Sequence, residues 1–326
     1  MKIIVDAFGG DNAPLEIIKG CSDAVNQLGV NILLTGNEKI IKNVASENSI
    51  SLNNIEIEDC SEVITMEDSA DAVLKTKKDS SMAVGLRLLS EGNGDAFISA
   101  GNSGALCMGA TLGIKRIKGI KRPAFAPVLP CAKGFFMLMD GGANIECRPE
   151  MLYQYALMGS IYMKKVMGIE NPRIGLANVG TEEHKGTELY QTTYKLLSES
   201  SLNFIGNVEG RDLSEGVCDI VVCDGFTGNL ILKTYEGVAI TLMKEIKNMF
   251  SSSKRGKLSA ALIMGSLKEF KTKFDYNSYG GAAILGTSKP VFKAHGNAKA
   301  VTILNAVKLC MEYVNADTIG EISSSL

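Results

Sequence analysis

The sequence lacks the cysteine and histidine spacings that bind zinc or form a redox-active disulfide. Its eight cysteines are scattered with no CxxC pair, and it has only two histidines. No stretch of about 18 uncharged apolar residues is present to span a membrane. The first residues, Met-Lys-Ile-Ile-Val-Asp, predict a strand and not a signal peptide. We therefore expect a cytoplasmic protein with free thiols and no metal site.

The sequence also lacks an excess of either charge. It has 34 Lys and Arg against 36 Asp and Glu, a net charge of -2, so nothing in the bulk charge favours a nucleic acid partner. Any basic site must be local. We find no Pro/Gly/Ser-rich linker and no low-complexity segment. We expect one α/β domain over residues 1–326, with a helix-rich excursion at about 229–275.

Short apolar runs alternate with helical patterns along the chain. We expect strands at 3–5, 31–34, 55–58, 95–99 and 174–178, and helices at 14–28, 38–47 and 81–90. The runs FFMLM at 135–139 and DIVVC at 219–223 are apolar almost throughout, as in strands that are covered on both faces. This alternation predicts a mostly parallel sheet between two layers of helices.

The predicted strands end in loops rich in glycine and asparagine. Six such loops occur, at 6–11, 99–104, 140–144, 178–182, 224–229 and 294–297. In open parallel sheets, ligands bind at the carboxyl ends of the strands, so we expect the loops to form one continuous site along one edge. The alternative is that glycine only permits tight turns there.

Glycine-rich turns before a helix expose backbone N–H groups that can bind phosphate or an oxyanion. The sequence has neither a Walker loop nor a GxGxxG motif, so a dinucleotide site has little support. Residues of these loops that we expect to bind phosphate or the remaining substrate are Gly9, Gly10, Asp11, Asn102, Ser103, Gly104, Asn144, Asp224, Thr227, Gly228 and His295.

The densest group of reactive side chains is Thr181-Glu-Glu-His-Lys-Gly-Thr-Glu188. Lys185 could neutralise a phosphate or oxyanion, and His184 could exchange a proton near neutral pH. The alternative is a charged helix N-terminus, where carboxylates are favoured by the dipole. No GxSxG motif and no recognisable cysteine nucleophile is present, so we expect catalysis by positioning and electrostatics.

The loop sequences, taken together, resemble the PlsX family of acyl-ACP:phosphate acyltransferases. The matching segments are IIVDAFGGDNAP at 3–14, FISAGNSGAL at 97–106, RPAFAP at 122–127, DGGAN at 140–144, NVGTEEHKG at 178–186, CDGFTGN at 223–229, YGGAAILG at 279–286 and AHGNA at 294–298. They span nearly the whole chain in the expected order. Phe8 departs from the family, which more often has Met there.

The resemblance implies a homodimeric three-layer α/β/α sandwich, similar to the isocitrate dehydrogenase and phosphotransacetylase folds. It implies transfer of a long-chain fatty acyl group from acyl carrier protein to inorganic phosphate, without a cofactor. The acyl phosphate would enter phospholipid synthesis, where a glycerol-phosphate acyltransferase is a possible partner. The residues that match the family's catalytic pair are Lys185 and Asn229. An amide at Asn229 would suit an oxyanion, and His184 would have a lesser role.

A basic run fits an acidic carrier protein. It contains five cations and no acidic residue, namely Lys115, Arg116, Lys118, Lys121 and Arg122. We expect it to dock the carrier, with a solvated charged loop as the alternative. A second basic segment, 254–273, has an apolar middle that includes Leu258 and Leu262. It predicts peripheral contact with the inner face of the cell membrane; the alternative is a helix that packs a dimer.

Three other functions compete with this interpretation. An NAD-dependent dehydrogenase could use a similar fold, but no paired-Asp metal cluster is evident in the sequence. A phosphotransacetylase-like enzyme would take acyl-CoA instead of the carrier, and sequence separates the two poorly. A non-enzymatic membrane-bound scaffold for lipid synthesis would not need the glycine-rich loops for its function.

Overall fold

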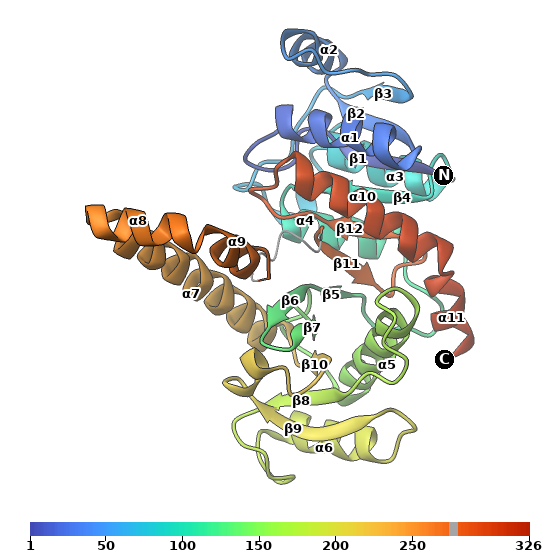
Figure 1. The fold of residues 1–326 in the computed structure, drawn as a ribbon. Coiled ribbons are helices and arrows are strands. Elements are labelled where there is room, and N and C mark those ends of the chain that lie inside the picture. Colours follow the sequence, from blue (N-terminus) through green and yellow to red (C-terminus); the bar gives the residue numbers. More distant parts are fainter. Residues whose placement is uncertain (274–279) are drawn as a thin grey trace.

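The computed structural model describes residues 1–273 and 280–326, and for residues 254, 257, 261 and 271–273 it describes only the backbone. The last two residues of the expected excursion, 274 and 275, and Tyr279 of the family segments lie outside the described residues. The described strands form two sheets with helices packed on their faces (Figure 1).

The first sheet has seven strands in the order β3-β2-β1-β4-β12-β11-β5. Their bounds are β1 Lys2–Asp6, β2 Asn31–Gly36, β3 Ile55–Asp59, β4 Ala96–Ser99, β5 Ala124–Ala126, β11 Ala282–Leu285 and β12 Val291–Lys293. Strands β1 to β4 and β12 are parallel, whereas β11 runs antiparallel to both β12 and β5. Alternate residues of β1 enter different cores: Ile3 and Val5 face one layer, and Ile4 faces the other.

The second sheet has five strands in the order β6-β7-β10-β8-β9. Their bounds are β6 Val128–Cys131, β7 Gly134–Met139, β8 Ile174–Asn178, β9 Phe204–Glu209 and β10 Ile220–Val222. Only β6 is antiparallel to its neighbour. The expected single edge is therefore wrong: three of the glycine-rich loops follow strands of the first sheet and three follow strands of the second. Strand β6 starts just after β5 ends, and this short crossing moves the chain from one sheet to the other.

Helices cover both sheets. The helices are α1 Leu15–Leu28, α2 Glu38–Glu47, α3 Ser81–Glu91, α4 Ser103–Gly109, α5 Pro149–Lys165, α6 Glu188–Ser198, α7 Gly225–Ser251, α8 Lys254–Leu262, α9 Met264–Lys273, α10 Ala300–Asn315 and α11 Thr318–Ser324. Helices α1 and α10 share a core with one face of the first sheet, and α3 and α4 share a core with the other. This arrangement confirms the predicted sandwich of mainly parallel sheets and helices.

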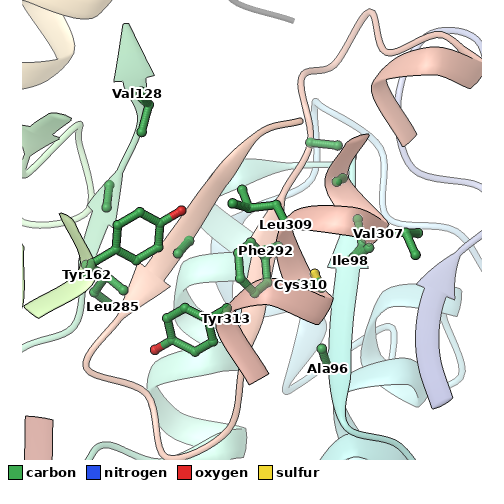
Figure 2. Close-up of a cluster of buried hydrophobic side chains, with 14 of the residues drawn as sticks. Ala96, Ile98, Val128, Tyr162, Leu285, Phe292, Val307, Leu309, Cys310 and Tyr313 are labelled. Carbon is green, nitrogen blue, oxygen red and sulfur yellow. The ribbon is translucent and has the colours of Figure 1, made fainter. Parts of the chain in front are cut away.

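One buried apolar core joins the two sheets. Figure 2 shows its centre, where Tyr162 of α5 lies near Phe292 of β12 and Tyr313 of α10. The ring of Tyr313 is 5.4 Å from that of Phe292, edge to face, and 6.0 Å from that of Tyr162. Edge-to-face aromatic pairs add to the free energy of simple burial. This cluster fixes the position of α5, and with it the second sheet, against the first.

The helix-rich excursion consists of α7, α8 and α9, which project away from both sheets (Figure 1). Helix α7 starts at Gly225, and its N-cap is Asp224, whose side chain accepts a hydrogen bond from the Thr227 N–H. Asn229 therefore lies inside the helix. Its expected place at the end of the preceding loop is wrong, because the Asp224 cap allows the helix to begin earlier.

Candidate active site

The three loops of the first sheet meet at its carboxyl edge. A Cβ atom on Gly9 would lie 2.6 Å from the Gly101 backbone nitrogen, and one on Gly10 would lie 2.7 Å from the Gly296 carbonyl oxygen. Side chains are thus excluded where the loops cross. The Asp11 N–H donates a 2.7 Å hydrogen bond to the same Gly296 carbonyl. Gly9, Gly10 and Asp11 therefore hold the loops together.

A buried lysine lies beneath this crossing. Lys293 ends β12, is only 7% exposed, and donates from Nζ to the carbonyl oxygens of Ala100 (3.0 Å) and Ala294 (2.5 Å). Burial lowers the pKa of its ammonium group to about 8. The positive charge of the Lys293 ammonium group raises the electrostatic potential at the loops that follow β4 and β12. This potential favours the binding of an anion at this edge of the sheet.

The first loop of the second sheet is built around Asp140. Its buried carboxylate accepts hydrogen bonds from the backbone N–H groups of Phe125, Gly142, Ala143 and Asn144, at 2.7–3.1 Å, and from the Asn144 side chain at 2.9 Å. Burial raises the pKa of this carboxyl group, and the N–H donors oppose the rise. One side chain thereby fixes the backbone of 141–144.

Helix α7 starts against that loop. The Gly225 N–H donates to the Asn144 carbonyl oxygen at 2.7 Å, and a Cβ atom on Gly228 would lie 1.8 Å from the Asp140 carbonyl oxygen. Only glycine allows this contact. The Asp224 carboxylate also accepts hydrogen bonds from the hydroxyl groups of Thr227 and Tyr190. Tyr190 belongs to α6, so it connects this helix, which follows the 178–188 segment, to the start of α7.

A cavity of about 380 Å³ opens between the two sets of loops. Its polar or charged lining residues are Ser103, Thr111, Arg122, Asn144, Asn229 and Lys233. Ser103 and Thr111 follow strand β4 of the first sheet, whereas Asn144 and Asn229 follow β7 and β10 of the second. The cavity is of a size that proteins use for small ligands. Loops of both sheets are needed to form it.

The cavity brings together some of the residues predicted from the sequence. Ser103, Gly104, Asn144, Asn229 and Arg122 line it. Arg122 was expected only in the carrier-docking patch, and its place in the lining gives it a second possible role. Asn102 lies behind the wall, where its Oδ1 caps α4 by accepting from the Ala105 N–H at 3.0 Å. Asp224, Thr227 and Gly228 likewise position α7 and are not part of the lining.

In the part of the chain that the structure describes, no residue of the 178–188 segment lines the cavity. His184 is exposed and Lys185 half-buried; the Lys185 Nζ lies 3.9 Å from the nearest carboxylate oxygen of Glu182. The Asn178 side chain donates to the Lys185 carbonyl oxygen at 3.1 Å and holds the turn in place. The catalytic roles of Lys185 and His184 stay predictions.

Three functional candidates were missed at the level of sequence: Asp140, Lys233 and Lys293. Lys233 lines the cavity and pairs with Glu236 at 2.9 Å, while the Nδ1 of His295 lies 3.9 Å from Glu236. His295 thus faces α7, at a site that joins the two sheets. The sequence pattern did mark the loop that contains Asp140. No pattern distinguishes Lys233 from the other lysines of an exposed helix.

The cavity offers anion binding and hydrogen-bond donors more readily than a nucleophile. Arg122 and Lys233 supply positive charge, and Asn229 supplies an amide. Burial raises the pKa of the Cys107 thiol in the lining to about 12, so this cysteine is protonated at neutral pH. Within residues 1–273 and 280–326, no group of three or more His, Cys, Asp or Glu side chains is placed to hold a metal ion.

Comparison with known proteins identifies the family. A family model described as "Fatty acid synthesis protein" matches residues 1–320. The chain belongs to this fatty acid synthesis family. The predicted membership of the PlsX family is thereby confirmed over nearly the full length.

Relatives with high similarity to this chain are named "Phosphate acyltransferase". The protein from Caldanaerobacter subterraneus subsp. tengcongensis is 49% identical, over 100% of this chain and 97% of its own length. The one from Clostridium tetani is 47% identical, over 100% and 98%. The prediction that this family member is an enzyme of the phosphate acyltransferase type is confirmed.

Solved structures support the fold of this family member. A phosphotransacetylase from Streptococcus pyogenes superposes with a TM-score of 0.63 at 15% identity, covering 97% of this chain and 94% of its own. A branched-chain phosphotransacylase from Enterococcus faecalis gives 0.59 at 16% identity, covering 96% and 99%. The predicted likeness to the phosphotransacetylase fold is confirmed.

Proposed function

We propose that the chain transfers a long-chain fatty acyl group from acyl carrier protein to inorganic phosphate, giving an acyl phosphate for phospholipid synthesis. The observation that carries this proposal is the cavity between the sheets, where two cations and the Asn229 amide meet in a fatty acid synthesis family. A phosphate oxygen attacks the thioester carbonyl carbon, the oxyanion collapses, and the C–S bond breaks. The carrier leaves as a thiolate, which takes up a proton.

The side chains fit the demands of that reaction. Phosphate is a dianion near neutral pH, so Arg122 and Lys233 attract it, with Lys293 adding positive potential from below. Charge develops on the carbonyl oxygen only as attack proceeds, and a preorganised amide stabilises it most at that point. The thiolate is a fair leaving group, so no strong general acid is required.

The decisive experiment mixes the purified protein with palmitoyl-carrier and phosphate. We expect palmitoyl phosphate and free carrier thiol to appear in equal amounts, and neither to appear without phosphate. Free thiol without acyl phosphate would indicate a thioesterase and overturn the proposal. The same assay with Lys185→Ala tests that residue: loss of most activity with an unchanged circular dichroism spectrum supports a catalytic role, and an unchanged rate removes it.

A phosphotransacetylase-like activity on acyl-CoA is a second candidate, because the Streptococcus pyogenes protein that shares the fold carries that name. Running the same reaction with palmitoyl-CoA separates the two. A clear preference for the carrier, judged by kcat/KM, supports the first proposal, whereas a preference for acyl-CoA supports the second.

We also propose that the segment 115–122 docks the carrier protein. Ile114, Ile117 and Ile120 are buried and anchor it, whereas the three cations between them and the two that follow are all exposed. Arg122 also lines the cavity. A carrier bound here would deliver its acyl group close to Asn229. Carrier proteins are acidic, and charge complementarity of this kind raises association rates.

Charge reversal tests the docking proposal. The triple variant Lys115→Glu, Lys118→Glu and Lys121→Glu should raise the KM for acyl-carrier roughly tenfold at low salt, since steering is lost. Added salt should shrink the difference, because it screens charges over about 8–10 Å. The KM for a small acyl thioester should not change.

The matched control reverses three exposed lysines on α1, α2 and α6, namely Lys19, Lys39 and Lys195. It makes the same change in net charge. Equal losses in the two triple variants would argue that only net charge matters, and equal losses on carrier and small thioester would place the damage in the cavity.

We further propose that α8 and α9 hold the protein against the inner face of the cell membrane. Leu258 is 66% exposed and Leu262 80% exposed, and Met264 and Phe270 are also exposed, in a segment rich in lysine. Apolar insertion combined with basic attraction suffices for peripheral binding. No helix in the described part of the chain is long and apolar enough to cross a bilayer.

The paired variant Leu258→Glu and Leu262→Glu should abolish co-sedimentation with anionic liposomes and leave activity in solution intact. The control is Ile40→Glu with Val301→Glu, two exposed apolar residues on other helices. Light scattering gives the mass of each variant. If the Leu258/Leu262 variant turns from a homodimer into a monomer, the segment is a dimer interface and the membrane proposal fails.

We also propose that a glycerol-phosphate acyltransferase associates with the protein, because such an enzyme would consume the acyl phosphate that this reaction makes.

A further inference from the structure

One wall of the cavity follows a single helical segment. Helix α4 continues into a π-helical turn at Ala110–Ile114, and six residues of this segment line the cavity. They are Ser103 and Gly104, Cys107 and Met108, and Thr111 and Leu112. The pairs are spaced four residues apart, so they lie on one face of the helix in successive turns. We call this face the α4 wall.

The large apolar side chains of the α4 wall, Met108 and Leu112, lie in its later turns, where Thr111 is the polar member. Ser103 lies at the N-terminal end, next to the cap residue Asn102, whereas Met108 and Leu112 lie in the following turns. From Ser103 to Leu112, the rise of a helix gives about 13 Å. Other elements add the apolar side chains of Phe125, Leu232 and Ile284 to the same cavity.

Two further features of the α4 wall suggest a ligand. Leu112 is 61% exposed although it is a large apolar residue on a cavity wall. An apolar ligand that covered it would gain about 25 cal/mol for each Å² removed from water. The π-helical turn that carries it is a rare structure, and turns of this kind occur often at functional sites.

We propose that the apolar part of the α4 wall, with Leu232 and Ile284, holds the alkyl chain of the acyl donor next to its thioester group. This inference rests on the proposed function. A pantetheine arm fits this part of the cavity poorly, because beyond Ser103 the α4 wall offers its amide groups one strong side-chain hydrogen-bond partner, Thr111. An alkyl chain has no such requirement. It would leave the cavity past Leu112, so long chains are accepted.

A second apolar groove, of about 460 Å³, lies along α7 and includes Leu230, Val238 and Leu242. It shares no residue with the cavity, whose α7 residues are Asn229, Leu232 and Lys233. A chain in this groove would occupy a different face of the helix from the Asn229 amide. The groove is therefore the rival site that the experiment must exclude.

The test measures kcat/KM for carrier thioesters of long and short acyl chains. Met108→Trp fills the α4 wall, so the ratio of kcat/KM for palmitoyl over butyryl donor should fall at least about tenfold. Leu112→Trp should also lower this ratio. Because Leu112 is exposed, the substitution should not disturb folding. The matched control Val238→Trp fills the α7 groove and should leave the ratio at the parent's value. A lowered ratio only in the control would place the chain in the groove and overturn the inference, as would an unchanged ratio in all three variants.

Binding of a fluorescent fatty acid provides a readout that does not depend on transfer. Met108→Trp should weaken it at least about tenfold relative to the parent. If Met108→Trp weakens this binding but the parent makes no acyl phosphate, the proposed function fails and the chain site stands. If the parent makes acyl phosphate and Met108→Trp binds the probe as tightly as the parent does, the chain site fails and the proposed function stands.

Discussion

Asn229→Ala is expected to lower turnover by a factor of about 100–1,000, the usual cost of removing one preorganised donor to an oxyanion. Asn229 lies in α7 and lines the cavity, and a Cβ atom on Gly142 would lie 3.1 Å from its Cβ. The amide is thus confined between α7 and the Asp140-centred loop. The KM values for phosphate and carrier should change far less, since the donor acts mainly after charge has developed.

Asn229→Asp should be slower still, because it places a negative charge beside the phosphate. Asn248→Ala, at an exposed position of the same helix, is the matched control and should behave as the parent does. Turnover of Asn229→Ala within about threefold of the parent, far below the expected loss, would limit Asn229 to shaping the cavity. A capping role for Asn229 is already ruled out, since Asp224 caps α7.

Asp140→Ala is expected to reduce the free energy of unfolding by about 3–5 kcal/mol. The substitution leaves four backbone N–H groups in a part-buried loop without their acceptor, those of Phe125, Gly142, Ala143 and Asn144. Each unsatisfied donor costs about 1–3 kcal/mol before the loop relaxes. Denaturant unfolding followed by circular dichroism measures the change.

Asp140→Asn keeps one carbonyl acceptor and should lose less stability than Asp140→Ala. Glu47→Ala removes an exposed carboxylate and serves as the control; its effect should stay within about 0.5 kcal/mol, as for most surface substitutions. A loss below about 1 kcal/mol in Asp140→Ala would show that water replaces the carboxylate.

The sequence predicted the individual strands and helices well, because each is determined by the residue pattern of its own short segment. Ile3 to Val5 and Ile220 to Val222 are apolar almost without interruption, as buried parallel strands require. The division into two sheets was not predictable in the same way. It depends on where Ala126-Pro127-Val128 directs the chain, and on β11 and β12 returning to the first sheet from far along the sequence.

The candidate site was predictable at positions where the backbone conformation or a close contact requires one residue type. Gly9 and Gly228 stand where any side chain would collide with another loop, and both were marked by their loops. Arg122 was assigned to docking alone, because a run of cations does not show which one turns inward. Lys233 was missed, because its role depends on where α7 points.

The order of strands in the first sheet has a consequence for the protein during its synthesis. Strands β1 to β5 leave the ribosome within the first 126 residues, yet β12 and β11, which separate β4 from β5, follow only at 282–293. Until then β4 presents an unpaired apolar edge, the kind that pairs with other chains. The nascent chain therefore carries an open sheet edge while residues 127–281 are made, and a chaperone that covers β4 during this time should raise the yield of folded protein.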